Sequence, residues 1–213
     1  GNIMSEFGYI TDQAQSRQNN KGIFSPTDIY DLTRADKWTQ TGQLELIKTE
    51  TVSSVGILDF TNIKQDIYDT HFMTMTNVTN ESANVYVGCV FSVDNGSNWD
   101  YASNYARSSW YIGSIGSGES RTTATGLIPL TSDTSSEDKN GYVYFYNLGD
   151  STKYSNLTSF HGEHSYLSQF LAGTHHEAVG NNAIRLTTNS GGDFSGTFSL
   201  YGVRGHEWEL YNL

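Results

Sequence analysis

The sequence predicts an all-β protein, an antiparallel two-sheet β-sandwich of jelly-roll type with a short N-terminal helix and an extended arm before it. Apolar residues recur at every second position in many short segments after residue 43, and turn-forming clusters separate these segments roughly every 8–15 residues. The composition agrees, because only 16% of the 213 residues are charged and 13% are aromatic. This mixture favours strands with uncharged polar faces over a helical bundle.

The first 41 residues are predicted to be an arm followed by a docking helix. Residues 1–24 offer little apolar surface to offset the entropy of ordering, so we expect them to become ordered only on a partner. Ser25 suits the N-cap of a helix, Pro26 its first position, and Asp28 the acidic position of a capping box. The helix presents one apolar stripe, formed by Ile29, Leu32, Ala35 and Trp38. So short a helix is marginally stable alone, and the stripe is predicted to dock on another surface.

Residues 43–204 are predicted to form the sandwich. The clearest strand is at residues 85–93, where five successive alternate positions are apolar: Val85, Val87, Cys89, Phe91 and Val93. Residues 43–52 also alternate, with Leu44 and Leu46 on one face and Ile47 on the other. Residues 69–78 place Phe72 among threonines on one face and His71 among methionines on the other. Further strands are predicted at residues 107–112, 122–130, 142–147, 156–161, 165–172, 183–188 and 196–203.

Several segments are predicted to lie outside the strands. Residues 113–121 are rich in Gly and Ser, and residues 131–141 carry three acidic residues, so both are predicted to be surface loops. Residues 205–213 are predicted to be a C-terminal tail. The segment 92–99 resembles an Asp-box turn, in which Asp94 accepts backbone N–H groups, Gly96 supplies a positive φ and Trp99 packs beneath. A single copy of this motif indicates a structural turn.

Charge and composition exclude several functions. The formal net charge of −11 disfavours binding to phosphate backbones or anionic bilayers, so neither nucleic acid nor a membrane is an expected partner. The sequence contains no run of about 18 apolar residues that could cross a bilayer. Cys89 is the only cysteine, which excludes an internal disulfide and suits a small core residue. The phosphate-binding, dinucleotide-binding and nucleophile-elbow motifs are absent, so we expect no cofactor and no enzyme activity.

A group of aromatic and polar residues is the best candidate for a ligand site. It consists of Trp99, Asp100, Tyr101, Tyr105, Trp110 and Tyr111. Aromatic rings stack on the faces of sugars and the acidic side chain can bind hydroxyl groups, so these residues are a candidate carbohydrate or receptor site. The alternative is that many of the rings fill the core of the sandwich.

Two weaker patterns leave their chemistry open. Two pairs of histidines lie close together in the sequence, His161 with His164 and His175 with His176. Imidazole is a common metal ligand, but the first spacing points the two side chains to opposite faces of a strand, so we predict no metal site. Glu207 and Glu209 lie at strand spacing beside Trp208, as in a glycan-cleaving enzyme, but the separation such an enzyme needs is not visible in a sequence.

The order of several segments also resembles virion proteins of marine bacteriophages, including phages of cyanobacteria. Residues 24–38 resemble a short N-terminal element that precedes varied domains in these proteins. Residues 43–52, 58–63 and 70–72 resemble the start of the β-domain that often follows it. Residues 195–203 are similar to the last strand of many phage fibre and appendage domains.

This resemblance implies a structural virion protein of the tail-fibre, appendage or head-decoration type, and it brings no catalytic residues. The implied location is the virion surface, after assembly in the cytoplasm of the bacterial host. The implied partners are other virion proteins and further copies of the chain, with a trimer favoured, and a host-surface glycan is a further possible ligand. A carbohydrate-binding module is the alternative hypothesis, and a glycan-cleaving enzyme is the third.

Overall fold

The computed structural model describes residues 26–34, 44–114, 116–133, 138–164 and 167–204. The chain divides into two units, Gly1–Gln43 and Leu44–Leu213. In the first unit the described residues form the helix α1 (Pro26–Arg34), whose last turn carries Arg34. The side chains of Ile29 and Leu32, and the whole of Ala35 and Trp38, lie outside the described part, so the docking stripe stays a prediction. No described helix is long and apolar enough to span a membrane.

Every regular element described in the second unit is a strand. The strands are β1 (Leu44–Val55), β2 (Ile57–Thr61), β3 (Thr70–Asn80), β4 (Val87–Ser92), β5 (Tyr105–Gly113), β6 (Gly116–Thr125), β7 (Ile128–Pro129), β8 (Lys139–Tyr146), β9 (Ser155–Glu163), β10 (Ser168–His175), β11 (Ala183–Thr188) and β12 (Phe194–Val203).

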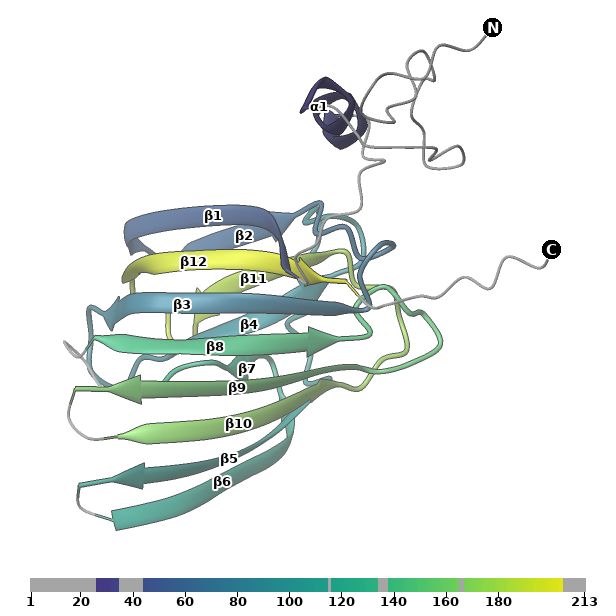
Figure 1. Ribbon diagram of the computed structural model, residues 1–213. Helices are drawn as coiled ribbons and strands as arrows, with labels where there is room; N and C mark the ends of the chain where they lie inside the picture. The colour runs from purple at the N-terminus through teal and green to yellow at the C-terminus, as the bar shows by residue number, and fades with distance from the viewer. Residues whose placement is uncertain (1–25, 35–43, 115, 134–137, 165–166, 205–213) are drawn as a thin grey trace, which may run out of the picture. The chain divides into compact units, whose positions relative to one another are not determined.

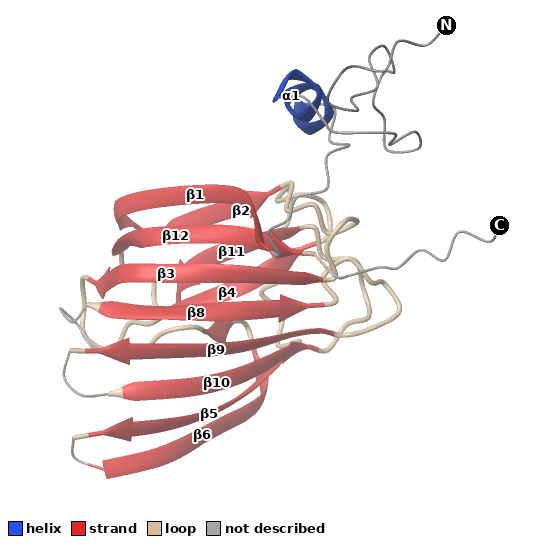
Figure 2. Cartoon of the chain, viewed as in Figure 1, coloured by secondary structure: helices blue, strands red, loops and turns tan. Residues whose placement is uncertain are grey.

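These strands form two antiparallel sheets (Figures 1 and 2). The larger has eight strands in the order β1-β12-β3-β8-β9-β10-β5-β6, and the smaller has four in the order β2-β11-β4-β7. One hydrophobic core contains residues from both sheets, including Phe145 from β8, Phe91 from β4 and Leu186 from β11. The prediction of an all-β, sandwich-like protein with two antiparallel sheets is therefore confirmed.

The alternation in the sequence identifies the core face of most strands. Along β3, buried and partly exposed residues alternate, and His71, Met73 and Met75, which were predicted to share one face, point inward. The thiol of Cys89 is free and fully buried, and burial raises its pKa. All six residues of β4 are buried, so both of its faces are covered. The prediction is wrong at Val93, which lies beyond the end of β4 and is 55% exposed.

Three local features differ from the prediction. Residues 113–121 were expected to be a loop, but Gly116–Thr125 forms β6, a polar edge strand paired with β5. The strand β2 lies in a segment for which the alternation gave no prediction. In β1, a bulge between Leu46 and Lys48 interrupts the alternation. Leu46, which is 54% exposed, and Ile47, which packs against the core, lie on opposite faces as predicted, but the bulge changes the face of the residues that follow, so that Lys48 lies opposite the buried Leu200.

Candidate functional site

The outward face of the eight-stranded sheet carries a continuous band of aromatic rings. Directly opposed residues of antiparallel strands share a face, so the strand register places these rings in two adjacent rows. One row contains Tyr201, Phe72 and Tyr144, and the next contains Tyr142, Phe160, Phe170 and Trp110. We call these seven residues the aromatic band.

Neighbouring rings of the aromatic band contact one another across the strands. The centroids of Phe72 and Tyr144 lie 4.8 Å apart, and Phe72 and Tyr201 lie 6.1 Å apart. Tyr142 lies 5.9 Å from Tyr144 and 6.0 Å from Phe160, which joins the two rows. The band ends in a stacked pair, Trp110 and Phe170, whose centroids are 6.5 Å apart. Both of these side chains are 50% exposed.

The surface around the aromatic band carries no charge over seven strands. The register from β1 to β5 defines three rows of outward positions: Leu44, Val203, Thr70, Tyr146, Asn156, Thr174 and Ala106; Leu46, Tyr201, Phe72, Tyr144, Thr158, Ala172 and Ser108; and Thr49, Ser199, Thr74, Tyr142, Phe160, Phe170 and Trp110. Charged residues appear only on the edge strand β6, where Arg121 and Glu119 end two of the rows. We call the three rows together the outer face.

A groove of about 600 Å³ lies at the Trp110 end of the aromatic band. Trp110, Phe170, Phe160 and Tyr142 form its aromatic side. The adjacent row supplies the smaller residues Ser108, Ala172 and Thr158, which leave the space beside the rings open. Glu119 adds one carboxylate to the lining. The groove can therefore accept an extended group with apolar faces and hydroxyl edges.

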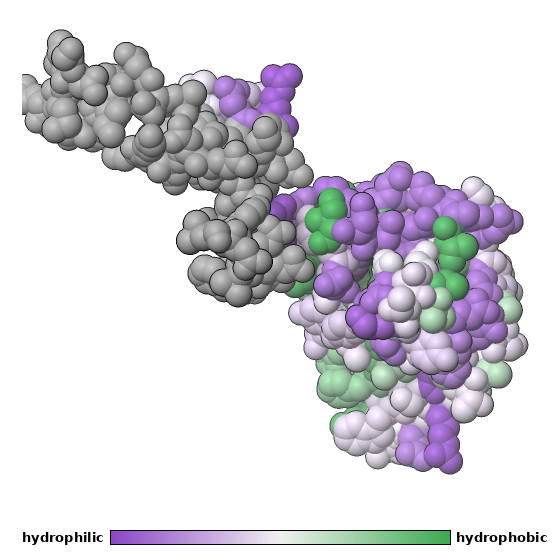
Figure 3. Space-filling model, turned by 90° about the vertical axis from the view of Figure 1, so that its right-hand side faces the viewer, coloured by the Kyte–Doolittle hydropathy of each residue, from purple (hydrophilic) through white to green (hydrophobic). Residues whose placement is uncertain are grey.

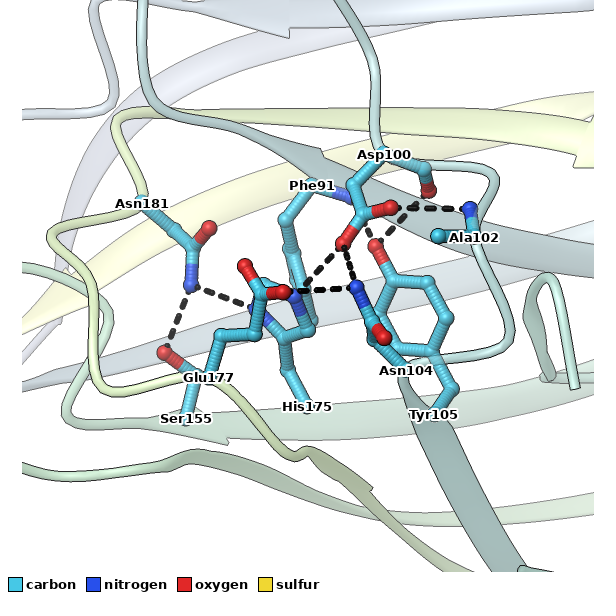
Figure 4. Close-up of polar contacts among 9 residues, drawn as sticks. All are labelled: Phe91, Asp100, Ala102, Asn104, Tyr105, Ser155, His175, Glu177 and Asn181. Carbon is cyan, nitrogen blue, oxygen red and sulfur yellow. Dashed lines mark hydrogen bonds and ion pairs between the residues drawn. The ribbon is translucent and has the colours of Figure 1, made fainter. Parts of the chain in front are cut away.

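A polar cluster around His175 joins three loops at the opposite end of β10 and β5 (Figure 4). Asn181 Nδ2 donates to His175 Nδ1 (3.2 Å) and to Ser155 Oγ (2.8 Å). Because His175 Nδ1 accepts a hydrogen bond, its proton is on Nε2, which donates to Asp100 Oδ2 at 2.9 Å. Asn104 Nδ2 bridges the carboxylates of Asp100 (3.2 Å) and Glu177 (2.7 Å).

The environment of this cluster lowers the pKa of Asp100 and holds the Tyr105 ring in place. Partial burial acts to raise the pKa of Asp100, but hydrogen bonds from Ala102 N, His175 and Asn104 outweigh it and hold the pKa below its usual range. Tyr105 is fully buried, donates to Asp100 O and accepts from Phe91 N. Its ring stacks on that of His175 at 4.8 Å. In Figure 3, the face of the domain that is turned to the viewer is mostly hydrophilic or of intermediate hydropathy, with a few separate hydrophobic patches.

The chemistry open to the His175 cluster is limited. One ligand atom from each of Asp100, His175 and Glu177 lies within 4.8 Å of the others, which is a possible arrangement for a metal. However, the hydrogen bonds between these side chains already use the His175 nitrogens. Ser155 is fully buried and accepts a bond from Asn181, so it is no accessible nucleophile. The arrangement is that of a structural network joining loops.

The structure does not bring the six predicted site residues together. Tyr105 and Asp100 belong to the His175 cluster. Trp99 packs under the turn at Gly96 (φ +89°), where Asn98 N donates to Asp94 Oδ1 at 2.8 Å, as expected for a structural turn. Arg185 lies over the Trp99 ring at 4.4 Å. The remaining predicted residues, Tyr101, Trp110 and Tyr111, are exposed at separate places, Trp110 and Tyr111 on opposite faces of β5.

The four histidines do not form one group either. His161 and His175 are buried at opposite ends of the β9–β10 pair, and His164 and His176 are exposed. Burial lowers the pKa of His161 to about 4. Glu207 and Glu209 lie outside the described residues.

Sequence reasoning missed six of the seven residues of the aromatic band. A signal was present at Tyr142, Tyr144 and Tyr146, which alternate along one strand. The register that places them beside Phe160 and Phe72 is a tertiary feature. No protein-family model matches the chain, and no curated protein is significantly similar to it.

Proposed function

We propose that the chain is a non-catalytic structural subunit of a phage particle, which assembles through its outer face and contributes to attachment at the host surface. The outer face carries this proposal. The chain has a net charge of −11, yet 21 outward positions on seven strands carry no charged residue and seven of them form the aromatic band. Depletion of charge and enrichment of aromatic residues characterise the centres of protein–protein interfaces.

The partner we propose for this surface is a second copy of the chain, and the resemblance to virion proteins favours a trimer. The outer face is six strand spacings of about 4.8 Å wide and three rows of about 7 Å long, which gives an area on the order of 600 Å². This is at the lower end of what each partner buries in a stable interface, about 600–1,000 Å². Copies with a net charge of −11 repel each other, and a charge-free face is where that repulsion is weakest.

The location on a phage particle rests on the sequence resemblance. A further part of this proposal is that the sandwich is a jelly roll. Its support is the strand order. In an eight-stranded jelly roll, one sheet pairs the strands in the order first, eighth, third and sixth, and the other in the order second, seventh, fourth and fifth. The orders β1-β12-β3-β8 and β2-β11-β4-β7 follow these two patterns. The hairpins β5–β6 and β9–β10 are then insertions that widen one sheet. The proposed attachment device is the N-terminal segment 1–41.

The oligomeric state of the full chain tests the proposed interface. We expect light scattering after size exclusion to give an oligomer, and Tyr142→Lys to shift it towards the monomer because a buried lysine would lack a partner. Tyr142 is 40% exposed in the single chain, so the variant should still fold. Tyr154→Lys is the matched control, since Tyr154 is 52% exposed in the loop between β8 and β9. A monomeric wild type at high concentration, or equal behaviour of both variants, contradicts the proposal.

Deleting residues 1–41 tests the attachment device. We expect the remaining chain to fold with an unchanged strand content by circular dichroism and to lose binding to its assembly partners. Loss of the fold itself would contradict the division into a sandwich and an attachment segment.

A second candidate function is glycan binding in the groove, supported by the exposed stack of Trp110 and Phe170. A glycan array with the wild type and Trp110→Ala distinguishes the two functions. Binding by the wild type that is lost in the variant favours a carbohydrate-binding domain. Absence of binding by both proteins leaves the aromatic band as an assembly surface only.

A further inference from the structure

A second cleft lies on the inward side of the same sheet. Strands β5 and β6 continue the eight-stranded sheet beyond β7, the edge strand of the smaller sheet (Figure 1). The inward-facing residues of β5 at this place are therefore not covered by a strand. They border a cleft of about 430 Å³, lined among others by Arg107, Ser109, Tyr111, Ser120 and Gln169. The volume lies within the usual range for small-ligand sites, about 300–1,000 Å³.

Arg107 places an unpaired positive charge in this cleft. Its only described hydrogen bond is from Nη1 to Ser120 Oγ at 3.4 Å, which is long for such a bond. Its Nε is buried and has no partner among the described residues. Two other half-buried arginines in the described part of the chain, Arg185 and Arg204, each pair with a carboxylate. A partly buried guanidinium without an acid is costly, and such a cost is typical of functional sites.

Ser109 provides a second unsatisfied group on the same face of β5, two residues further along the strand. It is only 6% exposed, and its Oγ has no hydrogen-bond partner among the described residues. Side chains two positions apart on a strand point the same way, and both residues line the cleft. Two independent polar groups in one cleft therefore lack the partners that buried groups normally have.

We propose that this cleft binds a carboxylated sugar. A guanidinium is suited to a carboxylate, with which it forms two parallel hydrogen bonds. The Ser109 and Ser120 hydroxyls and the Gln169 amide match the hydroxyl groups of a sugar ring. The rings of Tyr111 and Tyr86 also line the cleft and offer apolar faces for stacking. Asp133, at the exposed edge, can accept from sugar hydroxyls.

The cleft is independent of the proposed assembly surface. Along β5, Arg107, Ser109 and Tyr111 alternate with Ser108 and Trp110, which point to the outer face. An oligomer that covers the outer face thus leaves the cleft accessible. Failure of the assembly proposal would not affect the cleft, and the reverse also holds.

Isothermal titration of the full chain with glucuronate, galacturonate and N-acetylneuraminate tests the proposal. Glucose and N-acetylglutamate are the comparison ligands, one lacking the carboxylate and the other lacking the sugar. We expect at least one of the three carboxylated sugars to bind at least tenfold more tightly than both comparison ligands. The variant Arg107→Gln should weaken this binding at least tenfold, and Arg121→Gln should leave it unchanged. Arg121 is the matched control because it lies on the neighbouring strand β6 and points to the outer face.

Thermal unfolding of the same variants separates binding from structure. Because Arg107 has no acidic partner, Arg107→Gln should not lower the Tm relative to wild type. A lower Tm would assign the side chain a structural role and contradict the proposal. Binding of none of the three sugars, equal binding of N-acetylglutamate, or unchanged binding by Arg107→Gln would each overturn it.

Discussion

The rings of Phe160 on β9 and Phe170 on β10 lie 4.8 Å apart at directly opposed positions of the two strands. Each ring also contacts a further ring, Tyr142 beside Phe160 and Trp110 beside Phe170. The pair therefore connects the central part of the aromatic band to its exposed end. Aromatic contacts on a partly exposed face stabilise the sheet and also keep the rings in place for a partner.

A double-mutant cycle measures this contact. Replacing Phe160 and Phe170 by Ala, singly and together, should give a coupling free energy of about 0.5–1.5 kcal/mol in denaturant unfolding. The pair Phe160 and Tyr201 is the control, because no contact joins these rings and their effects should add. A coupling near zero for Phe160 and Phe170 would show that this ring contact contributes nothing to stability.

Replacing Arg185 by Lys should lower stability although the charge is kept. Arg185 forms two bonds to Asp59, Nε to Oδ1 at 2.7 Å and Nη2 to Oδ2 at 2.8 Å, and lies over the Trp99 ring. Lysine supports neither the paired bonds nor the planar stacking. We expect a loss of about 1 kcal/mol in the free energy of unfolding, since the group is partly exposed. A fully retained Tm would contradict this role.

Replacing His175 by Phe should destabilise the domain by about 2–4 kcal/mol, measured by denaturant unfolding. Phenylalanine can replace the stacking on Tyr105 but removes one hydrogen-bond partner from the fully buried Asn181 and one from the half-buried Asp100. Since those partners already satisfy His175, we expect EDTA to leave the Tm of the wild type unchanged. A lower Tm in EDTA would instead indicate a metal held by Asp100, His175 and Glu177.

Stability should fall as the pH decreases from about 6.5 to about 4. Burial lowers the pKa of His161 from 6.5 to about 4, so in this interval the unfolded chain binds a proton that the folded chain does not. The stabilising effect is complete above pH 6.5 and is lost progressively down to pH 4. Burial lowers the pKa of His71 in the same direction.

The variant His161→Gln isolates this contribution. Its amide oxygen can still accept from Ser132 N, as His161 Nε2 does at 3.0 Å. We expect a flatter dependence of Tm on pH between 6.5 and 4. Glu45 does not interfere with this measurement. Hydrogen bonds from Tyr68, Arg204 and Lys64 lower its pKa to about 2, so the stability that Glu45 contributes is lost only between about pH 4.5 and 2. An identical pH profile in wild type and variant would contradict the assignment to His161.

The strands that alternate cleanly were predictable. The period of two placed Cys89 in the core and Met73 on the face opposite Phe72, because alternation of side chains is a local property of a strand. The turn at Asp94 was also predictable, since its bonds join residues within the same turn. Residues 116–121 were not, because polar Gly, Ser and Thr carry the same signal in a loop and in an edge strand, and only pairing with β5 distinguishes them.

The sequence by itself determined the class of the protein: a β-rich, acidic chain with one buried thiol. Tertiary structure alone decided which aromatic residues meet. Tyr105 and Trp110 are both aromatic residues of the same strand, but Tyr105 is fully buried and Trp110 is half exposed. The two residues are five positions apart, so their side chains point to opposite faces of the strand. Phe72 meets Tyr144 and Tyr201 only through the register of β3, β8 and β12. Register depends on hydrogen bonds between distant segments, and no local pattern encodes it.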